Sequence, residues 1–322
     1  MTATWTTPAP ASVPAVPGPE PLRVSAVITT CGRPELLRKA VRSILEQDYP
    51  GHIEVVVVFD RIAVDALDDV VVPPGRSLKP IANTRTPGLA GGRNTGINAA
   101  GGEVIGFCDD DDHWHRQKIS RQLETWRAQP SAVAVASGIR IRTGGTDIVR
   151  LPPERVAFGD FLRSRITALH PSTMLYRRAD LLGRIGPVDE ELPAGYGEDY
   201  DLLLRATRYG DVVSTPEPLV GVLWDRPSFF AGRWANISGG LSYLLRKFPE
   251  FEASPRGLAR IAGQVAFAEA ALGNRAAARA WARSALSRDR RQLRAYAAWA
   301  VSLGLLDAAW IVRLVQKTGR GL

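Results

Sequence analysis

The stretch "VIGFCDDDDHW", residues 104–114, decides the fold prediction. Its apolar first half is typical of a buried β-strand, and four consecutive aspartates follow it. Capping of a helix would use one or two of these acids, but not four. Hard divalent cations such as Mg²⁺ and Mn²⁺ prefer carboxylate oxygens and share their coordination with substrate phosphates. The stretch therefore predicts a buried strand that ends at a metal site.

Strand and helix patterns alternate around this stretch, which favours an α/β fold. A strand, an amphipathic helix and a second, continuously apolar strand follow one another at 23–30, 33–47 and 52–60. This order predicts a right-handed crossover and a mostly parallel sheet flanked by helices. Further elements are expected as a helix at 93–100, strands at 103–108 and 132–137, less regular segments to about 155, and a helix at 198–206.

Polar residues stand where three of these strands end. Thr29 lies at the end of the first strand, Asp60 at the end of the second, and Asp109 directly after the strand at 103–108. Ligands bind such sheets at the carboxyl ends of the strands, so we expect these residues at one functional edge. The sequence contains no P-loop and no G-x-G-x-x-G after its first strand, which argues against a P-loop enzyme and a nicotinamide dehydrogenase.

The charge of the chain predicts its division into regions. The 322 residues carry a formal charge of +8, but residues 256–322 hold twelve Lys and Arg against three Asp and Glu. This segment alone therefore carries +9, and the rest of the chain about −1. We expect a disordered Pro/Ala-rich leader at 1–22, a catalytic domain at 23–250 and a basic α-helical region at 251–322. The leader resembles neither a secretory signal nor a membrane span.

Two cysteines and several acids leave specific expectations. Cys31 and Cys108 form no disulfide framework, and we expect them to be reduced and close together at the ends of neighbouring strands. In "GYGEDYD", the acids at 198, 199 and 201 begin a helix; a carboxylate there suits a general base, but it equally suits the helix dipole. His113 and His115 flank Trp114, and we expect them at the start of the following helix rather than on a metal.

Residues 24–209 resemble the inverting family 2 glycosyltransferases, which have the GT-A fold. The resemblance rests on four motifs in the family's order and covers about the first two thirds of the chain. It implies transfer of a sugar from a nucleotide donor to an acceptor hydroxyl, with Mn²⁺ or Mg²⁺ as the cofactor. The motifs are "VITTCGRPELL", "ILEQDYPGHIEVVVVFD", "AGGRNTGINAAGGEVIGFCDDDD" and "GEDYDLLLR".

The resemblance also implies roles for individual residues. Thr29 and Asp60 would hold the base and ribose of the nucleotide, and Arg93 would contact the nucleotide portion. The D-x-D pair would be Asp109 and Asp111. The remaining implied roles are donor binding by Asp110, direct metal binding by Asp111 with help from Asp109 and Asp112, general base catalysis by Asp199, and support of that base by Glu198.

The sequence departs from the family pattern at several points. Cys31 stands where an aromatic residue is common, and only Asp60 remains of the usual acid pair after the second strand. A histidine late in the catalytic domain is missing, and Asp225 is the candidate substitute ligand. The last histidine, His170, either lines the acceptor side or belongs to an ordinary extended segment before Pro171. These departures leave the identity of the nucleotide (UDP, dTDP or GDP) open.

Two other functions compete with glycosyl transfer. A sugar-nucleotide nucleotidyltransferase usually opens with a glycine-rich basic loop, which "TTCGRPELL" lacks. A non-catalytic sugar-nucleotide-binding scaffold with a basic helical tail would not need the two intact acid motifs. The apolar run at 295–315 is interrupted by Asp307 and Arg313, so it predicts either an interfacial helix or packing on the catalytic domain. We expect a cytoplasmic protein with peripheral contact to the inner, anionic membrane face, a glycan or lipid-linked acceptor, and no nucleic acid.

Overall fold

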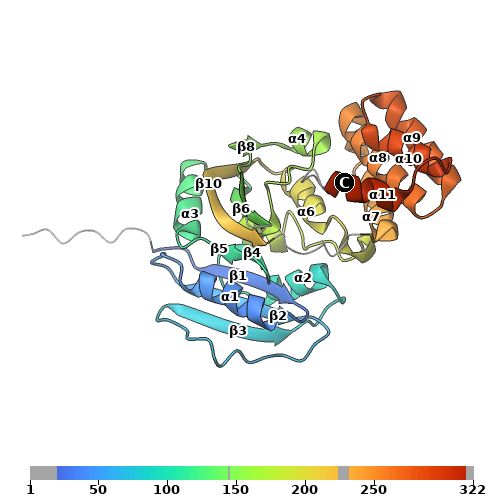
Figure 1. The fold of residues 1–322 in the computed structure, drawn as a ribbon. Helices are drawn as coiled ribbons and strands as arrows, with labels where there is room; N and C mark the ends of the chain where they lie inside the picture. Colours follow the sequence, from blue (N-terminus) through green and yellow to red (C-terminus); the bar gives the residue numbers. More distant parts are fainter. Residues whose placement is uncertain (1–19, 144–145, 224–231, 317–322) are drawn as a thin grey trace, which may run out of the picture.

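The structure is a computed structural model that describes residues 20–143, 146–223 and 232–316. Within them, a ten-stranded mixed sheet is flanked by helices, and further helices pack at one side (Figure 1). The main strand order is β3-β2-β1-β4-β9-β6-β10-β5, with β7 beside β6 and β8 beside β10. The strands are β1 (Val24–Thr30), β2 (Ile53–Phe59), β3 (Arg76–Ala82), β4 (Val104–Asp109), β5 (His113–Trp114), β6 (Ala134–Thr143), β7 (Thr146–Arg150), β8 (Arg155–Val156), β9 (Leu175–Arg177) and β10 (Val212–Leu223). The helices are α1 (Pro34–Leu45), α2 (Leu89–Ala99), α3 (Lys118–Ala128), α4 (Phe158–Arg163), η1 (Pro171–Thr173), α5 (Arg178–Leu182), η2 (Pro193–Gly195), α6 (Glu198–Ala206), α7 (Trp234–Lys247), η3 (Pro249–Ala253), α8 (Pro255–Ala271), α9 (Arg275–Arg288), α10 (Leu293–Ser302) and α11 (Ala308–Gln316).

The N-terminal half of the sheet is parallel, as the sequence predicts. β1 pairs in parallel with β2 and β4, and β2 pairs in parallel with β3. In this register Thr29 lies opposite Asp109, and the backbone N–H of Asp60 donates to the carbonyl of Thr30 at 2.8 Å. The three predicted strand-end residues therefore stand at one edge of the sheet.

The second half of the sheet departs from the sequence prediction. β6 is longer than the expected strand at 132–137, and the segment predicted as less regular forms the antiparallel hairpin of β6 and β7. β3 and β10 were not predicted. β3 is a half-exposed strand at the end of the sheet order and contains Lys79 and Pro80, so it lacks the apolar run by which the other strands are recognised.

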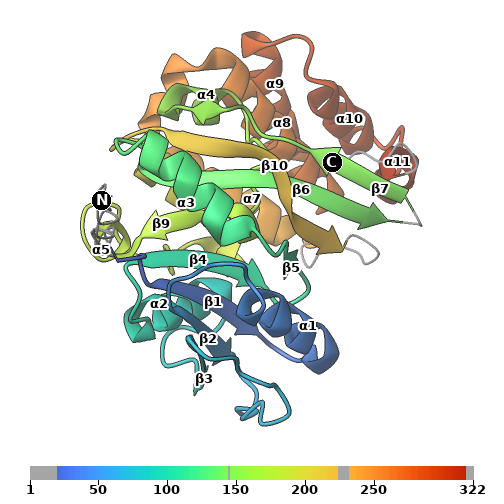
Figure 2. The same ribbon diagram turned by 90° about the vertical axis from the view of Figure 1, so that its left-hand side faces the viewer.

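The sheet is covered on both faces by apolar helix surfaces. On β1, Ala26 and Ile28 belong to one buried cluster and Val27 to the other, because successive side chains of a strand point to opposite faces. The first cluster packs under α1 and α3, which lie on the near face in Figure 2. The second cluster packs under α2, α4, α6, α7 and the first part of α8.

The helices α8 to α11, residues 255–316, form the helical extension. Alanines of α8 and α9 pack closely across a hairpin whose turn contains Gly273, at a φ of +81°. Leu258, Ile261 and Val265 of α8 also belong to the core under the sheet, so the extension is anchored on the α/β part. The expected domain division at residue 250 stays a prediction. No helix of the described residues has the length and apolarity needed to cross a bilayer.

Candidate active site

The four aspartates occupy the end of β4 and a tight turn behind it. Asp109 is the last residue of β4, and its carbonyl accepts a hydrogen bond from the N–H of Asp112 at 3.1 Å. Asp110 accepts hydrogen bonds from Thr30 Oγ1 at 2.7 Å and from Arg33 Nη1 at 3.1 Å. The same guanidinium nitrogen forms an ion pair with Asp111. Arg33 therefore supplies the positive charge for the middle two aspartates.

Asp109 and Asp112 meet a histidine that comes from a distant part of the sequence. Ligand atoms of Asp109, Asp112 and His170 all lie within 4.8 Å of one another. His170 Nδ1 lies 3.4 Å from Asp112 Oδ2, and its Nε2 lies 3.9 Å from Asp109 Oδ2. Ser172 accepts a hydrogen bond from the Asp109 N–H at 3.0 Å and donates its hydroxyl to Asp112, so it holds both acids in place.

This cluster fits a divalent cation. Asp112 is 3% exposed, and no Lys or Arg of the described residues forms an ion pair with it. A buried carboxylate without such a partner is costly, and a cation would supply the missing charge. Two carboxylates and an imidazole are suitable ligands for Mn²⁺, and two carboxylates for Mg²⁺. Asp109, Asp112 and His170 are therefore the residues that would hold the metal.

The structure places the other candidate ligands differently. Asp111 points its carboxylate to Arg33 and is not in the three-residue cluster, so its direct metal contact stays a prediction. His113 and Trp114 form β5, which pairs with β10, and α3 begins only at Lys118. The expected helix start at the two flanking histidines is therefore wrong. Asp225, the proposed substitute ligand, lies outside the described residues.

Arg93 connects the aspartate turn to the start of α6. Its guanidinium forms an ion pair with Glu198 and donates a hydrogen bond to Asp109 Oδ1 at 3.0 Å. α2 can bring Arg93 this close because it carries glycine against β1: a Cβ on Gly92 would lie 2.3 Å from Thr29 Cγ2. Arg93 is buried, and its contacts with both acid motifs are part of the fold. The implied contact with a nucleotide stays a prediction.

The two acids at the start of α6 have separate arginine partners. Arg165 Nη2 lies 2.8 and 2.7 Å from the two carboxylate oxygens of Asp199. Burial works to raise the pKa of Asp199, but the charge and hydrogen bonds of Arg165 outweigh it and hold this pKa below its usual range. Burial raises the pKa of Glu198, although the Arg93 guanidinium opposes that shift. Asp199 is thus the more strongly ionised of the pair, and an ionised carboxylate is able to accept a proton.

Asp60 and the hydroxyl oxygen of Thr29 are buried, although Thr29 as a whole is partly exposed. Asp60 is 2% exposed and accepts hydrogen bonds from Asn83 Nδ2 at 2.8 Å and the Gly88 N–H at 3.0 Å. It therefore tethers the loop that leads into α2. The hydroxyl of Thr29 is buried beneath Gly92 without a hydrogen-bond partner among the described residues. Their contacts with the base and ribose stay predictions.

Three residues of the site were missed by the sequence analysis. Arg33 comes three residues after the first strand ends, and this place near a strand end was the available signal. Arg165 lies in an irregular loop, and Ser172 lies in a 3₁₀ turn before β9, so only the tertiary structure brings them to the acids. Cys31 and Cys108 form no disulfide with each other; Cys31 is exposed and Cys108 buried. Their expected proximity stays a prediction.

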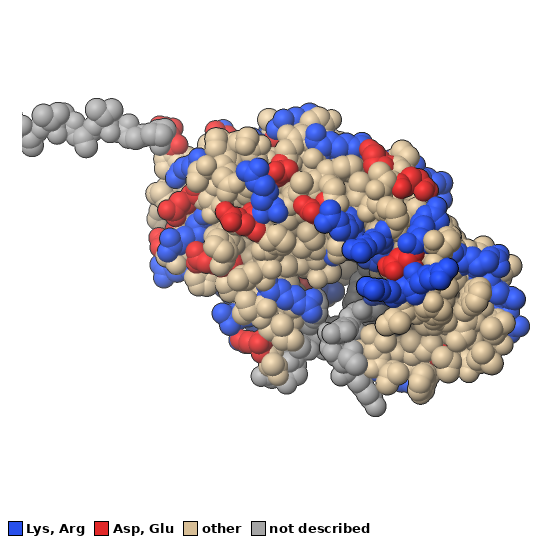
Figure 3. Space-filling model, turned by 90° about the horizontal axis from the view of Figure 1, so that it is seen from above, with Lys and Arg blue, Asp and Glu red and all other residues tan. Residues whose placement is uncertain are grey.

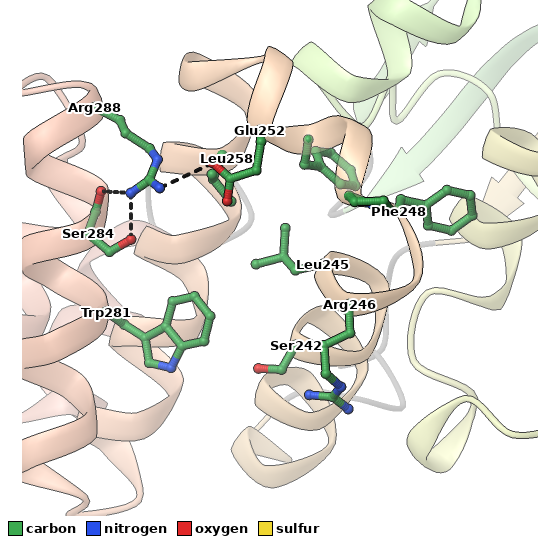
Figure 4. A pocket seen from close by; sticks show the side chains of 11 residues that line it. Ser242, Leu245, Arg246, Phe248, Glu252, Leu258, Trp281, Ser284 and Arg288 are labelled. Atoms are coloured by element: carbon green, nitrogen blue, oxygen red, sulfur yellow. Dashed lines mark hydrogen bonds and ion pairs between the residues drawn. The ribbon is translucent and has the colours of Figure 1, made fainter.

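A separate cavity of about 360 Å³ lies between α7, η3 and α9 (Figure 4). Trp281 and Leu245 point into it, and Arg288 closes one side through hydrogen bonds to Ser284 and an ion pair with Glu252 at 3.3 Å. None of the candidate site residues lines this cavity. The acidic edge of the sheet is therefore the candidate active site, and the cavity is not part of it.

Part of the chain is similar to known proteins. Residues 25–182 match the model of glycosyl transferase family 2. The succinoglycan biosynthesis protein ExoO of Rhizobium meliloti is 28% identical over 221 residues, which cover 62% of this chain and 60% of ExoO. WfaP of Escherichia coli, a UDP-Glc:alpha-D-GlcNAc-diphosphoundecaprenol beta-1,3-glucosyltransferase, is 32% identical over 100 residues, or 31% of this chain and 39% of WfaP. The chain thus spans less than two thirds of the length of these relatives.

A solved structure shares the fold. The mannosyltransferase PcManGT from Pyrobaculum calidifontis, in complex with GDP-Man and Mn²⁺, aligns with a TM-score of 0.55 at 21% identity. The alignment covers 92% of this chain and 88% of that protein. The mixed sheet flanked by helices is therefore the GT-A fold. Residues 25–182 of the chain are therefore similar to glycosyl transferase family 2.

Proposed function

We propose that the chain is a metal-dependent, inverting glycosyltransferase that uses a nucleotide-sugar donor. The observation that carries this proposal is the meeting of two acid sites at one sheet edge. A cation site of Asp109, Asp112 and His170 and a proton acceptor, Asp199, are held in one network through Arg93 and Glu198. The similarity of residues 25–182 to glycosyl transferase family 2 and the GT-A fold support the same assignment.

The donor would bind with its diphosphate at the cation site. A divalent cation there supplies the positive charge that stabilises the departing nucleoside diphosphate. Asp110 and Asp111 would contribute through Arg33, which stands beside the turn and pairs with both. UDP-, dTDP- and GDP-sugars are the candidate donors; WfaP is named for a UDP-sugar, and PcManGT was solved with a GDP-sugar.

Asp199 would act as the general base. Its carboxylate would accept the proton of the acceptor hydroxyl while that oxygen attacks the anomeric carbon and the bond to the diphosphate breaks. Attack from the face opposite the leaving group inverts the anomeric centre and needs no protein nucleophile. Arg165 supports this role because it keeps Asp199 ionised and fixes the orientation of its carboxylate.

The acceptor would be a hydroxyl of a glycan or of a lipid-linked saccharide. ExoO is named for the biosynthesis of a polysaccharide, and WfaP for an acceptor on diphosphoundecaprenol. Both are acceptor classes in which a sugar hydroxyl attacks, which the ionised Asp199 suits. The chain covers only part of each relative, so its own acceptor is a matter for experiment.

Release of nucleoside diphosphate from a panel of UDP-, dTDP- and GDP-sugars, with Mn²⁺ and oligosaccharide acceptors, tests the proposal. We expect metal-dependent release that falls by about 10²- to 10⁴-fold in Asp199→Asn. Asp147→Asn, at an acid of the β6–β7 hairpin, serves as the matched control and should keep full activity. Release of pyrophosphate from a nucleoside triphosphate and a sugar phosphate would instead identify a nucleotidyltransferase and contradict the proposal.

A further inference from the structure

The helical extension ends in a concentration of exposed apolar side chains. Of the twenty large hydrophobic residues that are exposed in the described part of the chain, eight fall between residues 293 and 314. Exposed apolar residues scattered singly are ordinary, whereas a contiguous group marks an interaction surface. The eight residues lie on α10, on the turn after it and on α11, and together they form the α10–α11 surface: Leu293, Tyr296, Trp299, Leu303, Leu305, Leu306, Trp310 and Leu314.

α10 contributes one face of its helix to this surface. Leu293, Tyr296 and Trp299 are 80%, 48% and 37% exposed, and they recur at three-residue spacing. The opposite face, with Ala295 and Ala298, is buried against α8 and α9. The usual arrangement of a surface helix is thus absent, because the outer face of α10 carries bulky apolar and aromatic side chains and the inner face carries alanines.

The turn between α10 and α11 carries three exposed leucines. Leu303, Leu305 and Leu306 are 56%, 71% and 42% exposed. The turn is well satisfied within the chain: the Leu305 N–H donates to the carbonyl of Ala300 at 2.9 Å, and Asp307 Oδ1 caps the N–H of Trp310 at 2.8 Å. The backbone therefore needs no partner here, and the leucines leave much of their apolar surface to solvent.

α11 extends the surface with Trp310 and Leu314, which are 49% and 50% exposed and lie one helical turn apart. Arg313 is exposed on the same helix. Arg290 and Arg291 are exposed just before α10, at the other end of the surface. Apolar and aromatic side chains with arginines at both ends are typical of a helix pair that lies in a membrane interface.

The surrounding charge favours an anionic partner. Residues 256–322 carry +9, and Asp307, the acid of the connecting turn, is engaged in capping α11. Figure 3 shows a broad uncharged surface on the helical extension with Lys and Arg side chains at its border. A second copy of this chain would bring a second basic border to the same contact and be repelled, whereas an anionic bilayer attracts both the charge and the apolar residues.

We propose that the α10–α11 surface docks on anionic lipid membranes, with Trp299, Leu305 and Trp310 in the interface and the arginines at the headgroups. Since none of the helices in the described residues spans a bilayer, the contact is peripheral. This inference does not depend on the proposed reaction. It would place the catalytic edge of the same molecule near acceptors that are held at a membrane.

Flotation of the full chain with vesicles tests the proposal. Vesicles of phosphatidylcholine alone are compared with equimolar phosphatidylcholine and phosphatidylglycerol, at low and high salt. We expect binding to the anionic vesicles only, and about fivefold weaker binding at low salt for Arg313→Gln. Leu305→Ser and Leu314→Ser should each weaken partitioning by about tenfold, because burying a leucine is worth at least that factor.

Matched controls come from exposed apolar residues of the α/β part. Val71 is 85% and Leu151 50% exposed, so Val71→Ser and Leu151→Ser remove similar surface outside the helical extension. These variants should bind like the unmodified chain. Absence of binding to anionic vesicles, or equal losses in the control variants, would overturn the proposal. A concentration-dependent dimer that Leu305→Ser abolishes, with no vesicle binding, would overturn it in favour of a second copy.

Discussion

Replacing Arg165 by Met removes the arginine that contacts both oxygens of the Asp199 carboxylate. An adjacent arginine lowers a carboxyl pKa by about one to three units. The Arg165 side chain is 35% exposed, so solvent screens part of its effect on Asp199. We therefore expect the pKa of Asp199 to rise in Arg165→Met, because the burial of the carboxyl is then no longer offset by the guanidinium. The loss of a fixed carboxylate orientation should lower kcat at neutral pH by about tenfold.

The pH profile of kcat separates these two effects. Asp199 accepts a proton only when ionised, so activity falls as the pH drops through its pKa. Because Arg165 holds this pKa below its usual range, the unmodified enzyme should stay active to lower pH than Arg165→Met. The same pair stabilises the folded protein above the ordinary aspartate pKa, and this contribution is lost as the pH falls further.

Two further variants make this prediction specific. Arg165→Lys keeps the charge but loses the two-oxygen contact, so it should keep the acid limb near its original position with an intermediate kcat. Arg163→Met removes a nearby arginine that is 65% exposed and should change neither quantity. An Arg165→Met enzyme with unchanged kcat and an unchanged acid limb would refute the assignment of Asp199 as the base.

Other outcomes follow from the geometry of the site. Asp112→Asn should abolish Mn²⁺-dependent donor binding in calorimetric titration, and Asp111→Asn should weaken it less, whereas the reverse order would restore Asp111 as the principal ligand. Gly92→Ala should lower stability by roughly 1–2 kcal/mol, measured by chemical unfolding, because the new Cβ meets both γ atoms of Thr29 and helix propensity offsets only part of the clash. Gly159→Ala on α4, where a Cβ meets nothing within 4 Å, should not be destabilising. Thiol titration should find Cys31 reactive and Cys108 protected until unfolding; a disulfide in the native protein would contradict this.

The parallel half of the fold could be predicted because its strands are apolar runs. Residues 24–30, 53–59 and 104–109 form strands within a residue of the expected bounds, and the acids at 198 and 199 begin a helix as expected. β3 could not be predicted because its side chains are half-exposed and include Arg76, Lys79 and Pro80. A continuous apolar run in the sequence indicates a strand that is buried on both faces. A half-exposed strand lacks such a run and is missed.

The acids of the site were visible in the sequence, but their partners were not. Four adjacent aspartates and a Glu-Asp pair are local signals, which the sequence analysis used. His170 and Arg165 reach the acids only because η1 packs beside β4 and the loop after α4 passes the start of α6. His170 and Asp112 are 58 positions apart, and Arg165 and Asp199 are 34 apart. Contacts over such separations leave no periodic pattern in the sequence, so His170 could not be recognised as a candidate metal ligand.

The most direct test of the cation site is anomalous scattering from crystals soaked with Mn²⁺ and a nucleoside diphosphate. We expect one strong manganese peak in contact with Asp109, Asp112 and His170, beside the bound diphosphate. A manganese peak on Asp111 and away from His170 would contradict it, and so would a bound diphosphate with no manganese at this edge of the sheet.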